Sequence, residues 1–290
     1  MLRIELLIDG RDSLGEGPLW DVAEQRLYWI DSYGKAVHRC DARGGDRRDW
    51  AVPDHIGSMC LRERGGGVVA LRHGFHFLDL DTGDCAPIHD PEPELPRTRL
   101  NDGKVDRQGR FLAGSMDYEE RDGLGALYRL DPDLSVTRLD GGIVCSNGPC
   151  WSLDGRTLYF ADSFARVIYA YDYDTATGAV RSRRRFASFE NLRGYPDGAT
   201  VDADDCVWSV EVFSGRLIRF TPEGVIDRIV GLPVASTTSL TFGGPELDIA
   251  FVTSMARPTA GVKPAEREAG GVFAIHGLGV RGVPEPRFAG

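Results

Sequence analysis

Six polar side chains stand at matching positions along the chain, each 10 or 11 residues before an anchor residue in a short hydrophobic run. The anchor residues are Leu27, Val68, Phe111, Leu158, Val207 and Ile249. The six polar residues are Glu16, Ser58, Asn101, Asn147, Asp197 and either Thr238 or Ser239. Two carboxylates and two carboxamides in this set supply the all-oxygen donors that hard divalent cations prefer. Buried together, Glu16 and Asp197 would repel each other, and a cation between them would remove that cost. The set therefore predicts a divalent-metal site, provided that the fold gathers these positions.

Glycine follows several of these residues directly or one position later, as in GEGP (15–18), NDG (101–103), SNGP (146–149) and PDG (196–198). Asn-Gly and Asp-Gly are also the commonest signals of tight hairpin turns, so each glycine could mark an ordinary turn. Glu16 is not a turn former, and the proline behind the glycine in two of these segments stiffens the backbone. The pattern alone leaves metal ligands and plain turns both open.

The hydrophobic runs have the character of β-strands and recur at a steady interval. They are RLYWIDS (26–32), GVVALRH (67–73), RFLAGSM (110–116), TLYFADS (157–163), VWSVEVF (207–213) and IAFVTSM (249–255). The steps between their anchor residues are 41, 43, 47, 49 and 42 residues, and a second strand-like run follows each. This period is typical of β-propeller blades. We expect an all-β, six-bladed propeller over residues 1–290 as a single domain, with the six polar positions on one ring around the channel.

Composition narrows the class of protein. The net charge of −10 disfavours nucleic acid and anionic membranes as partners. The one basic run, RSRRR (181–185), is expected to be a solvated outer strand. No apolar stretch approaches the roughly 18 residues of a membrane span, and the N-terminal run is interrupted by charges. Six cysteines without a C-x-x-C pair indicate reduced thiols, so we expect a soluble, cytoplasmic protein.

Other catalytic motifs have little support. The chain has no G-x-S-x-G elbow and no H-x-x-x-H pair. SYGK (32–35) matches S-x-x-K by letters but falls in a strand turn rather than on a helix. DYDTATG (172–178) resembles the start of a calcium loop but lacks the third oxygen ligand and the closing Glu. We therefore expect residues 172–178 to form an outer hairpin turn.

Four motifs carry a family resemblance that covers nearly the whole chain. LGEGPLWD, RLNDGKVDRQGRFLAGSM, SNGPCWSLDGRTLYFADS and YPDGATVDADDCVW closely resemble segments of the regucalcin/gluconolactonase family, also called senescence-marker-protein-like lactonases. The motifs come in the order and at the spacing of that family. The resemblance implies a six-bladed propeller with one divalent metal at the mouth of the channel. It also implies hydrolysis of sugar lactones to aldonic acids.

The resemblance also implies roles for individual residues. Glu16, Asn147 and Asp197 would be the metal ligands, and Arg99 and Asn101 would contact the substrate. Asp197 would also be catalytic, because a carboxylate beside the metal can accept the proton of the attacking water.

Glu119 matches a further substrate-contacting acid of the family, although Ser115 replaces the family threonine upstream of it. The cation would be Ca²⁺ or Zn²⁺ first, with Mn²⁺, Mg²⁺ and Fe²⁺ as further candidates. The partner would be a small sugar lactone, selected by rim loops such as 117–124 and 256–269, and the protein a monomer or weak dimer. Two alternatives remain: a calcium-binding regulatory propeller, and a metal-dependent esterase acting on other esters.

Overall fold

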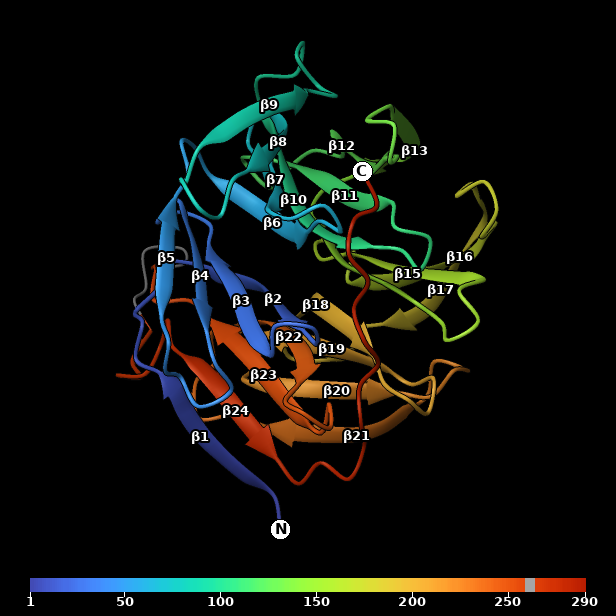
Figure 1. Cartoon of the computed structure of the whole chain (residues 1–290). Helices are drawn as coiled ribbons and strands as arrows, with labels where there is room; N and C mark the ends of the chain where they lie inside the picture. The colour runs from blue at the N-terminus through green and yellow to red at the C-terminus, as the bar shows by residue number, and fades with distance from the viewer. Residues whose placement is uncertain (259–263) are drawn as a thin grey trace.

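The computed structural model describes residues 1–258 and 264–290, in which all regular secondary structure is β. Four-stranded antiparallel sheets succeed one another along the chain (Figure 1). The first three are β2 (Gly15–Asp21), β3 (Arg26–Asp31), β4 (Ala36–Cys40) and β5 (Arg48–Ala51), then β6 (Ile56–Leu61), β7 (Gly67–Leu71), β8 (Gly74–Leu78) and β9 (Cys85–His89), then β10 (Thr98–Val105), β11 (Phe111–Asp117), β12 (Gly125–Leu130) and β13 (Val136–Ile143).

The next three sheets complete the ring. They are β14 (Ser146–Trp151), β15 (Thr157–Asp162), β16 (Val167–Tyr173) and β17 (Val180–Ser188), then β18 (Tyr195–Val201), β19 (Val207–Val212), β20 (Arg216–Phe220) and β21 (Ile226–Gly231), and last β22 (Thr237–Gly243), β23 (Ile249–Ser254), β24 (Val272–His276) and β1 (Arg3–Ile8). The prediction of a six-bladed β-propeller is confirmed. The repeated hydrophobic runs are β3, β7, β11, β15, β19 and β23, the second strand of every blade.

The first strand of each blade lies at the centre of the ring. Each inner strand contacts the next, from β2 to β6 and onward to β22, and β22 contacts β2 again. The ring is closed by β1, which pairs with β24 as the outermost strand of the last blade (Figure 1). Joining the two ends of the chain in one sheet leaves no gap between the first and last blades. The repeat pattern did not predict this closure.

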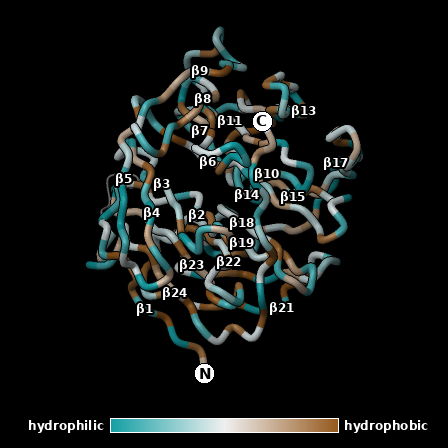
Figure 2. The backbone as a smooth tube through the Cα atoms, in the orientation of Figure 1, coloured by the Kyte–Doolittle hydropathy of each residue, from teal (hydrophilic) through white to brown (hydrophobic). Residues whose placement is uncertain are grey.

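The hydrophobic core is divided among the six blade interfaces. Each cluster of buried side chains joins two neighbouring sheets, for example the fifth and sixth blades. Successive residues of one strand serve opposite interfaces: Val207 packs toward the fourth blade and Trp208 toward the sixth. The strands therefore carry hydrophobic residues on both faces. Figure 2 shows the hydrophobic residues in brown along the strands of the ring. This double burial explains why their sequences are hydrophobic runs rather than simple alternations.

The C-terminal segment, residues 281–290, crosses the end of the ring where the inner strands finish (Figure 1). It bonds to the turns there, with Phe288 N donating to Leu61 O and Ala289 N to Gly109 O. Glu285 pairs with Lys104, a residue of β10, at 2.9 Å. The opposite end of the channel, where the inner strands begin, is the end that carries the predicted ring of polar residues.

Two further expectations concern the surface and the thiols. All six cysteines are free, in agreement with the sequence analysis. RSRRR belongs to β17, an exposed outer strand, as expected. No helix long and apolar enough to cross a membrane occurs in the described parts of the chain.

Candidate active site at the channel mouth

Every inner strand has an irregular register at the predicted ring position, where it holds one residue more than its partner strand. The irregularities fall between Glu16 and Leu19, Ile56 and Ser58, Leu100 and Gly103, Asn147 and Cys150, Pro196 and Ala199, and Thr237 and Leu240. Such β-bulges redirect side chains and are common beside functional sites. The six polar residues, which occupy the same position in each sequence repeat, thus lie at a β-bulge that recurs in every inner strand around the channel.

Two glycines are required by this backbone. Gly17 and Gly148 have φ angles of 50° and 55°, in the left-handed region that costs a residue with a Cβ atom about 1–2 kcal/mol. A Cβ on Gly148 would also lie 2.8 Å from the carbonyl oxygen of Asp197. This glycine therefore lets β14 approach β18, so that Asn147 and Asp197 lie on adjoining strands. The glycines that could have marked plain turns form part of the site.

Asp197 lies close enough to Glu16 to affect the ionisation of Glu16. Burial raises the pKa of Glu16 well above its ordinary value, and the charges of Asp197 and Asp102 raise it further. Burial and the charge of Asp102 likewise raise the pKa of Asp197 well above the usual range. Asp102 is itself buried beneath them, where it accepts hydrogen bonds from Gly103 N and Gly148 N at 2.8 Å each. The mouth of the channel therefore concentrates negative charge in a poorly solvated place.

A chain of hydrogen bonds links three blades across this mouth. Arg99 Nη1 donates to Asn101 Oδ1 at 2.6 Å, and Asn101 Nδ2 donates to Asn147 Oδ1 at 3.1 Å. Asn147 Nδ2 donates to Ser163 Oγ at 2.8 Å, and the Ser163 hydroxyl donates to Pro196 O at 2.6 Å. The sequence separates these groups widely, yet each fixes the orientation of the next. The last acceptor belongs to the residue directly before Asp197.

The donor set at the mouth fits a hard divalent cation. Because Ser163 commits its hydrogen to Pro196, its oxygen must accept from the Asn147 amide, which identifies Oδ1 as the carbonyl end of that side chain. Oδ1 accepts one hydrogen bond, from Asn101, and keeps a second lone pair for a further partner. Asn147 Oδ1 and the carboxylates of Glu16 and Asp197 are all hard oxygen donors. No three side chains of His, Cys, Asp or Glu gather as a metal cluster within residues 1–258 and 264–290. The third oxygen donor at the mouth is the amide of Asn147 rather than one of these groups. A cation would offset the negative charge of the Glu16 and Asp197 carboxylates.

The remaining ring positions make structural contacts. Ser58 Oγ donates to Asn101 O at 2.8 Å, and Thr238 Oγ1 donates to the carbonyl of Gly15. Both hydroxyls thus tie one inner strand to its neighbour. Ser239 is buried against Gly198, where a Cβ would overlap its side chain. The six predicted ring positions therefore fall into two sets. One set carries carboxylates and amides at the mouth, and the other carries hydroxyls that connect neighbouring blades.

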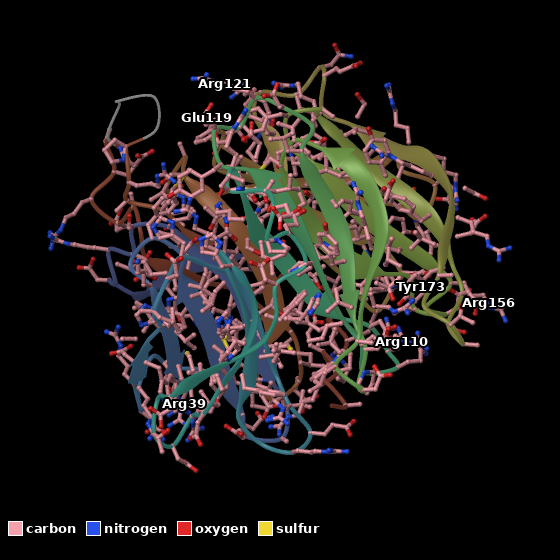
Figure 3. The ribbon with its side chains drawn as sticks, turned by 90° about the horizontal axis from the view of Figure 1, so that it is seen from above. Arg39, Arg110, Glu119, Arg121, Arg156 and Tyr173 are labelled. Atoms are coloured by element: carbon pink, nitrogen blue, oxygen red, sulfur yellow. The ribbon has the colours of Figure 1, made fainter. Side chains whose placement is uncertain are left out.

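Glu119 lies on the rim loop after β11, away from the hydrogen-bond chain. Its side chain is 51% exposed and lies 3.6 Å from Arg97 and 3.5 Å from Arg121. Figure 3 shows Glu119 beside Arg121 at the periphery of the molecule. The charge from this loop that raises the pKa of Asp197 is instead that of Glu120, whose φ angle is 58°. The role of Glu119 in substrate contact stays a prediction.

Sequence reasoning missed the residues that hold the site in place. Asp31 accepts hydrogen bonds from Ser13 N and Leu14 N, and Asp162 accepts them from Val144 N and Cys145 N. Each aspartate therefore fixes the segment that enters an inner strand, just before Glu16 or Asn147. The signal was present, because the runs at 26–32 and 157–163 both end in Asp-Ser. Ser163 is the serine of the second pair.

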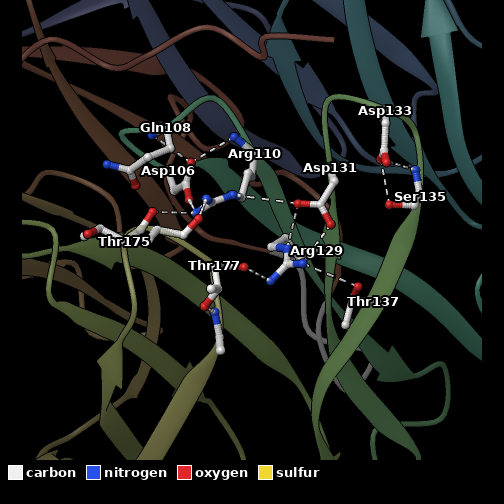
Figure 4. Close-up of polar contacts among 12 residues, drawn as sticks. Asp106, Gln108, Arg110, Arg129, Asp131, Asp133, Ser135, Thr137, Thr175 and Thr177 are labelled. Carbon is white, nitrogen blue, oxygen red and sulfur yellow. Dashed lines mark hydrogen bonds and ion pairs between the residues drawn. The ribbon is translucent and has the colours of Figure 1, made fainter.

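The turn that resembled a calcium loop serves the packing of two blades. Arg110 Nη1 donates to Thr175 O at 3.1 Å, and Arg129 Nη1 donates to Thr177 O at 2.8 Å (Figure 4). Asp174 accepts hydrogen bonds from the backbone of its own turn. Two guanidinium groups at these carbonyls would oppose a cation, in agreement with the prediction of an outer hairpin turn. Of the two rim loops expected to select substrate, 117–124 is described, whereas 256–269 lies partly outside the described residues.

Comparison with known proteins places these features in context. A family model described as "SMP-30/Gluconolactonase/LRE-like region" matches residues 14–256. Regucalcin of Xenopus laevis is 36% identical over 296 residues, which cover 100% of this chain and 99% of the relative. The 6-deoxy-6-sulfogluconolactonase of Pseudomonas putida is 35% identical over 280 residues, covering 96% and 95%. The crystal structure of a calcium-binding protein, regucalcin of Agrobacterium tumefaciens, has a TM-score of 0.90 at 25% identity and covers 98% of this chain and 96% of that one.

Proposed function

The chain belongs to the SMP-30/gluconolactonase/LRE-like family, and from this premise we propose that it is a metal-dependent hydrolase of sugar lactones. The observation that carries the proposal is the pair of neighbouring carboxylates, Glu16 and Asp197, with raised pKa values beside an oriented amide oxygen of Asn147. The name of the Pseudomonas relative, which concerns a sugar lactone, supports the substrate class.

Glu16, Asn147 and Asp197 would hold the cation. When bound, the cation supplies Lewis-acid polarisation of the lactone carbonyl and of water, and it offsets the negative charge of its ligands. The Agrobacterium relative is described as calcium-binding, which favours Ca²⁺. Zn²⁺, Mn²⁺, Mg²⁺ and Fe²⁺ suit the same oxygen donors and belong in the same test.

The remaining roles follow from the positions of the side chains. Asp197 would accept the proton of the attacking water, because a carboxylate beside the cation is ionised and within reach of the water that the cation activates. Arg99 is 4% exposed and uses Nη1 for Leu100 O and Asn101 Oδ1, which aims a preorganised guanidinium at the mouth. Arg99 and Asn101 would bind sugar hydroxyls and stabilise the negative charge that develops on oxygen. Glu119 would receive hydroxyls at the rim.

A calcium-binding regulatory propeller is the second candidate, since the relatives named regucalcin include one described as calcium-binding. The chain of hydrogen bonds from Arg99 to Ser163 favours the enzyme, because holding calcium alone requires no oriented guanidinium. We further propose that the protein works as a cytoplasmic monomer or weak dimer without nucleic-acid or membrane partners.

The test measures acid release from a panel of γ- and δ-aldonolactones after chelation and after addition of each cation. We expect hydrolysis only in metal-replete samples, and a loss of at least about a hundredfold in Asp197→Asn. Asp172→Asn, in the turn that resembles a calcium loop, is the matched control and should retain activity. If the replete protein leaves aldonolactones at their spontaneous rate, the lactonase proposal fails. Faster turnover of aryl esters than of lactones would favour the esterase instead.

A further inference from the structure

Aromatic and cationic side chains form a continuous stack on the rim of the mouth. Arg257 Cζ lies 3.9 Å from the centre of the Tyr33 ring, and the rings of Tyr33 and His55 are 4.6 Å apart. His55 stacks on Tyr118 with centres 5.8 Å apart, and Arg72 Cζ lies 4.9 Å from the Tyr118 ring. These residues come from turns after β3, β7, β11 and β23 and from the segment before β6. All of these segments lie at the end of the ring where the inner strands begin.

Arg72 is held rigidly but lacks acceptors. Its backbone N donates to His55 O at 2.8 Å, and its Nη2 makes one long hydrogen bond, 3.4 Å, to Pro96 O. Its Nε is buried without a hydrogen-bond partner, and no carboxylate lies within ion-pair distance among the described residues. The nearby Arg97, in contrast, is fully engaged, with Asp117 and Asp122 each at 2.9 Å. An unpaired guanidinium beside the mouth of an acidic protein is suited to an anionic ligand.

Arg72 lies near Arg99, which is predicted to contact the substrate, so an anionic group bound at Arg72 could belong to the same substrate molecule. Arg72 stacks on the Tyr118 ring, and the charges of Arg72 and Arg99 both act on His55 and on Tyr118, so both guanidinium groups lie near this pair of rings. The Tyr118 hydroxyl and His55 Nδ1 lie 2.9 Å apart. Burial lowers the pKa of His55, and both arginines act in the same direction, although Asp54 opposes them. Asp54 is itself paired with Lys35 at 3.4 Å, which limits its effect on an anion bound at Arg72.

We propose that Arg72, His55 and Tyr118 form a subsite for an anionic group carried on the part of the sugar lactone remote from its carbonyl. The inference rests on the proposed lactonase function and specifies its substrate class. The forked guanidinium of Arg72 binds the anionic oxygens, while Tyr118 and His55 supply a flat wall with a hydroxyl and a ring nitrogen at its edge. Arg99 remains free to act nearer the carbonyl. Sulfonate, phosphate and carboxylate groups share the chemistry that this subsite would recognise.

The first experiment compares kcat/KM for 6-phosphoglucono-δ-lactone, 6-deoxy-6-sulfogluconolactone and neutral glucono-δ-lactone. We expect wild type to prefer an anionic lactone and Arg72→Gln to reduce that preference at least about tenfold, the effect of one charge-assisted contact. Tyr118→Phe should reduce it less, and it tests the subsite if the arginine variant does not fold. Arg48→Gln is the matched control, because Arg48 lies over the Trp50 ring on the outer strand β5 and makes one hydrogen bond of 3.4 Å, to Asp81 O. An equal loss in Arg48→Gln, or no preference in wild type, overturns the subsite.

A binding measurement separates this inference from the lactonase proposal. Isothermal titration calorimetry with 6-phosphogluconate, which has no lactone to hydrolyse, reports the subsite without turnover. We expect Arg72→Gln to weaken its binding at least about tenfold and to weaken that of gluconate, which has the same carboxylate but no phosphate, much less. Anion binding that depends on Arg72 in a protein without lactonase activity would support the subsite and refute the proposed reaction. Lactone hydrolysis with equal affinity for 6-phosphogluconate and gluconate would refute the subsite alone.

Discussion

Neutralising one carboxylate at the channel mouth should have opposite effects on stability and on metal binding. Burial disfavours ionisation of both Glu16 and Asp197 in the metal-free protein. The charges of Asp197 and Asp102 add to this cost for Glu16, and the charge of Asp102 adds to it for Asp197. Glu16→Gln or Asp197→Asn removes that cost and keeps a polar group of similar shape. We therefore expect both variants to be more stable than wild type without metal, and to lose the stabilisation that metal gives.

The size of each effect can be estimated. Relief of strain at a functional site typically raises the free energy of unfolding by about 0.5–2 kcal/mol. A cation at a hundred times its dissociation constant stabilises wild type by about 2.7 kcal/mol. Each kcal/mol shifts the melting temperature of a chain of this size by roughly 2–4 °C. Metal should therefore raise the melting temperature of wild type by about 5–10 °C, whereas the variants should begin a few degrees higher and respond weakly.

The assay is thermal unfolding of chelated and metal-replete protein, followed by circular dichroism. Glu211→Gln is the matched control, because Glu211 is a fully buried carboxylate in the fifth blade. It accepts from Gly194 N at 2.6 Å and from Ser214 Oγ at 2.7 Å, and it pairs with Arg216, so that its pKa is lowered despite burial. Its neutralisation should destabilise the protein and leave the response to metal unchanged.

The reasoning would be refuted by a particular pattern of melting temperatures. If the two mouth variants are less stable than chelated wild type, as Glu211→Gln should be, the mouth carboxylates are structural groups. If wild type shows no metal-dependent rise while both variants are stabilised, the electrostatic strain is real but no cation binds the mouth. If wild type and both variants show the same rise, the cation has another site. Only a gain without metal, together with a lost response, agrees with ligands that are held at an electrostatic cost.

Three further outcomes are expected. Burial raises the pKa of Asp12 to about 6, so this carboxyl group makes the folded protein less stable as pH rises from about 4 to 6. Asp12→Asn should therefore raise the free energy of unfolding by ~1–3 kcal/mol at neutral pH but not at acid pH, as measured by urea unfolding. Glu285→Gln leaves the buried Lys104 ammonium without its carboxylate and should cost about 3 kcal/mol in the same assay. Gly148→Ala places a Cβ against Asp197 O and should weaken metal binding about tenfold by calorimetry while every ligand is retained.

The repeat made the propeller predictable, because one spacing rule applies along the entire chain. The hydrophobic runs mark the second strand of every blade, since that strand is buried on both faces and has the strongest signal. The outer strands are exposed and variable, so the pairing of β1 with β24 had no comparable pattern. Ring closure also depends on residues separated by nearly the length of the chain, which local sequence patterns do not report.

The sequence predicted those residues of the candidate site that occupy the same position in each repeat. Glu16, Asn101, Asn147 and Asp197 all lie at the bulges of inner strands, as the spacing suggested. The sequence could not distinguish these from Ser58, whose hydroxyl is consumed by a neighbouring strand. Rim residues were harder to place, because loops keep no repeat phase and one residue of difference reverses a side chain. The contrast between Glu119 and Glu120 is an example of that uncertainty.

The charges along the channel support the proposal of a divalent ion at its mouth. When all are ionised, the four carboxylates Glu16, Asp102, Asp197 and Glu285 and the ammonium of Lys104 give a formal charge of −3. The C-terminal segment contributes to this excess, because Glu285 pairs with Lys104 and so weakens its compensation of Asp102. Arg99 returns one positive charge at the mouth, which leaves −2. A monovalent ion would leave a buried charge uncompensated, whereas a divalent ion at Glu16 and Asp197 would make the channel neutral from its mouth to the C-terminal segment.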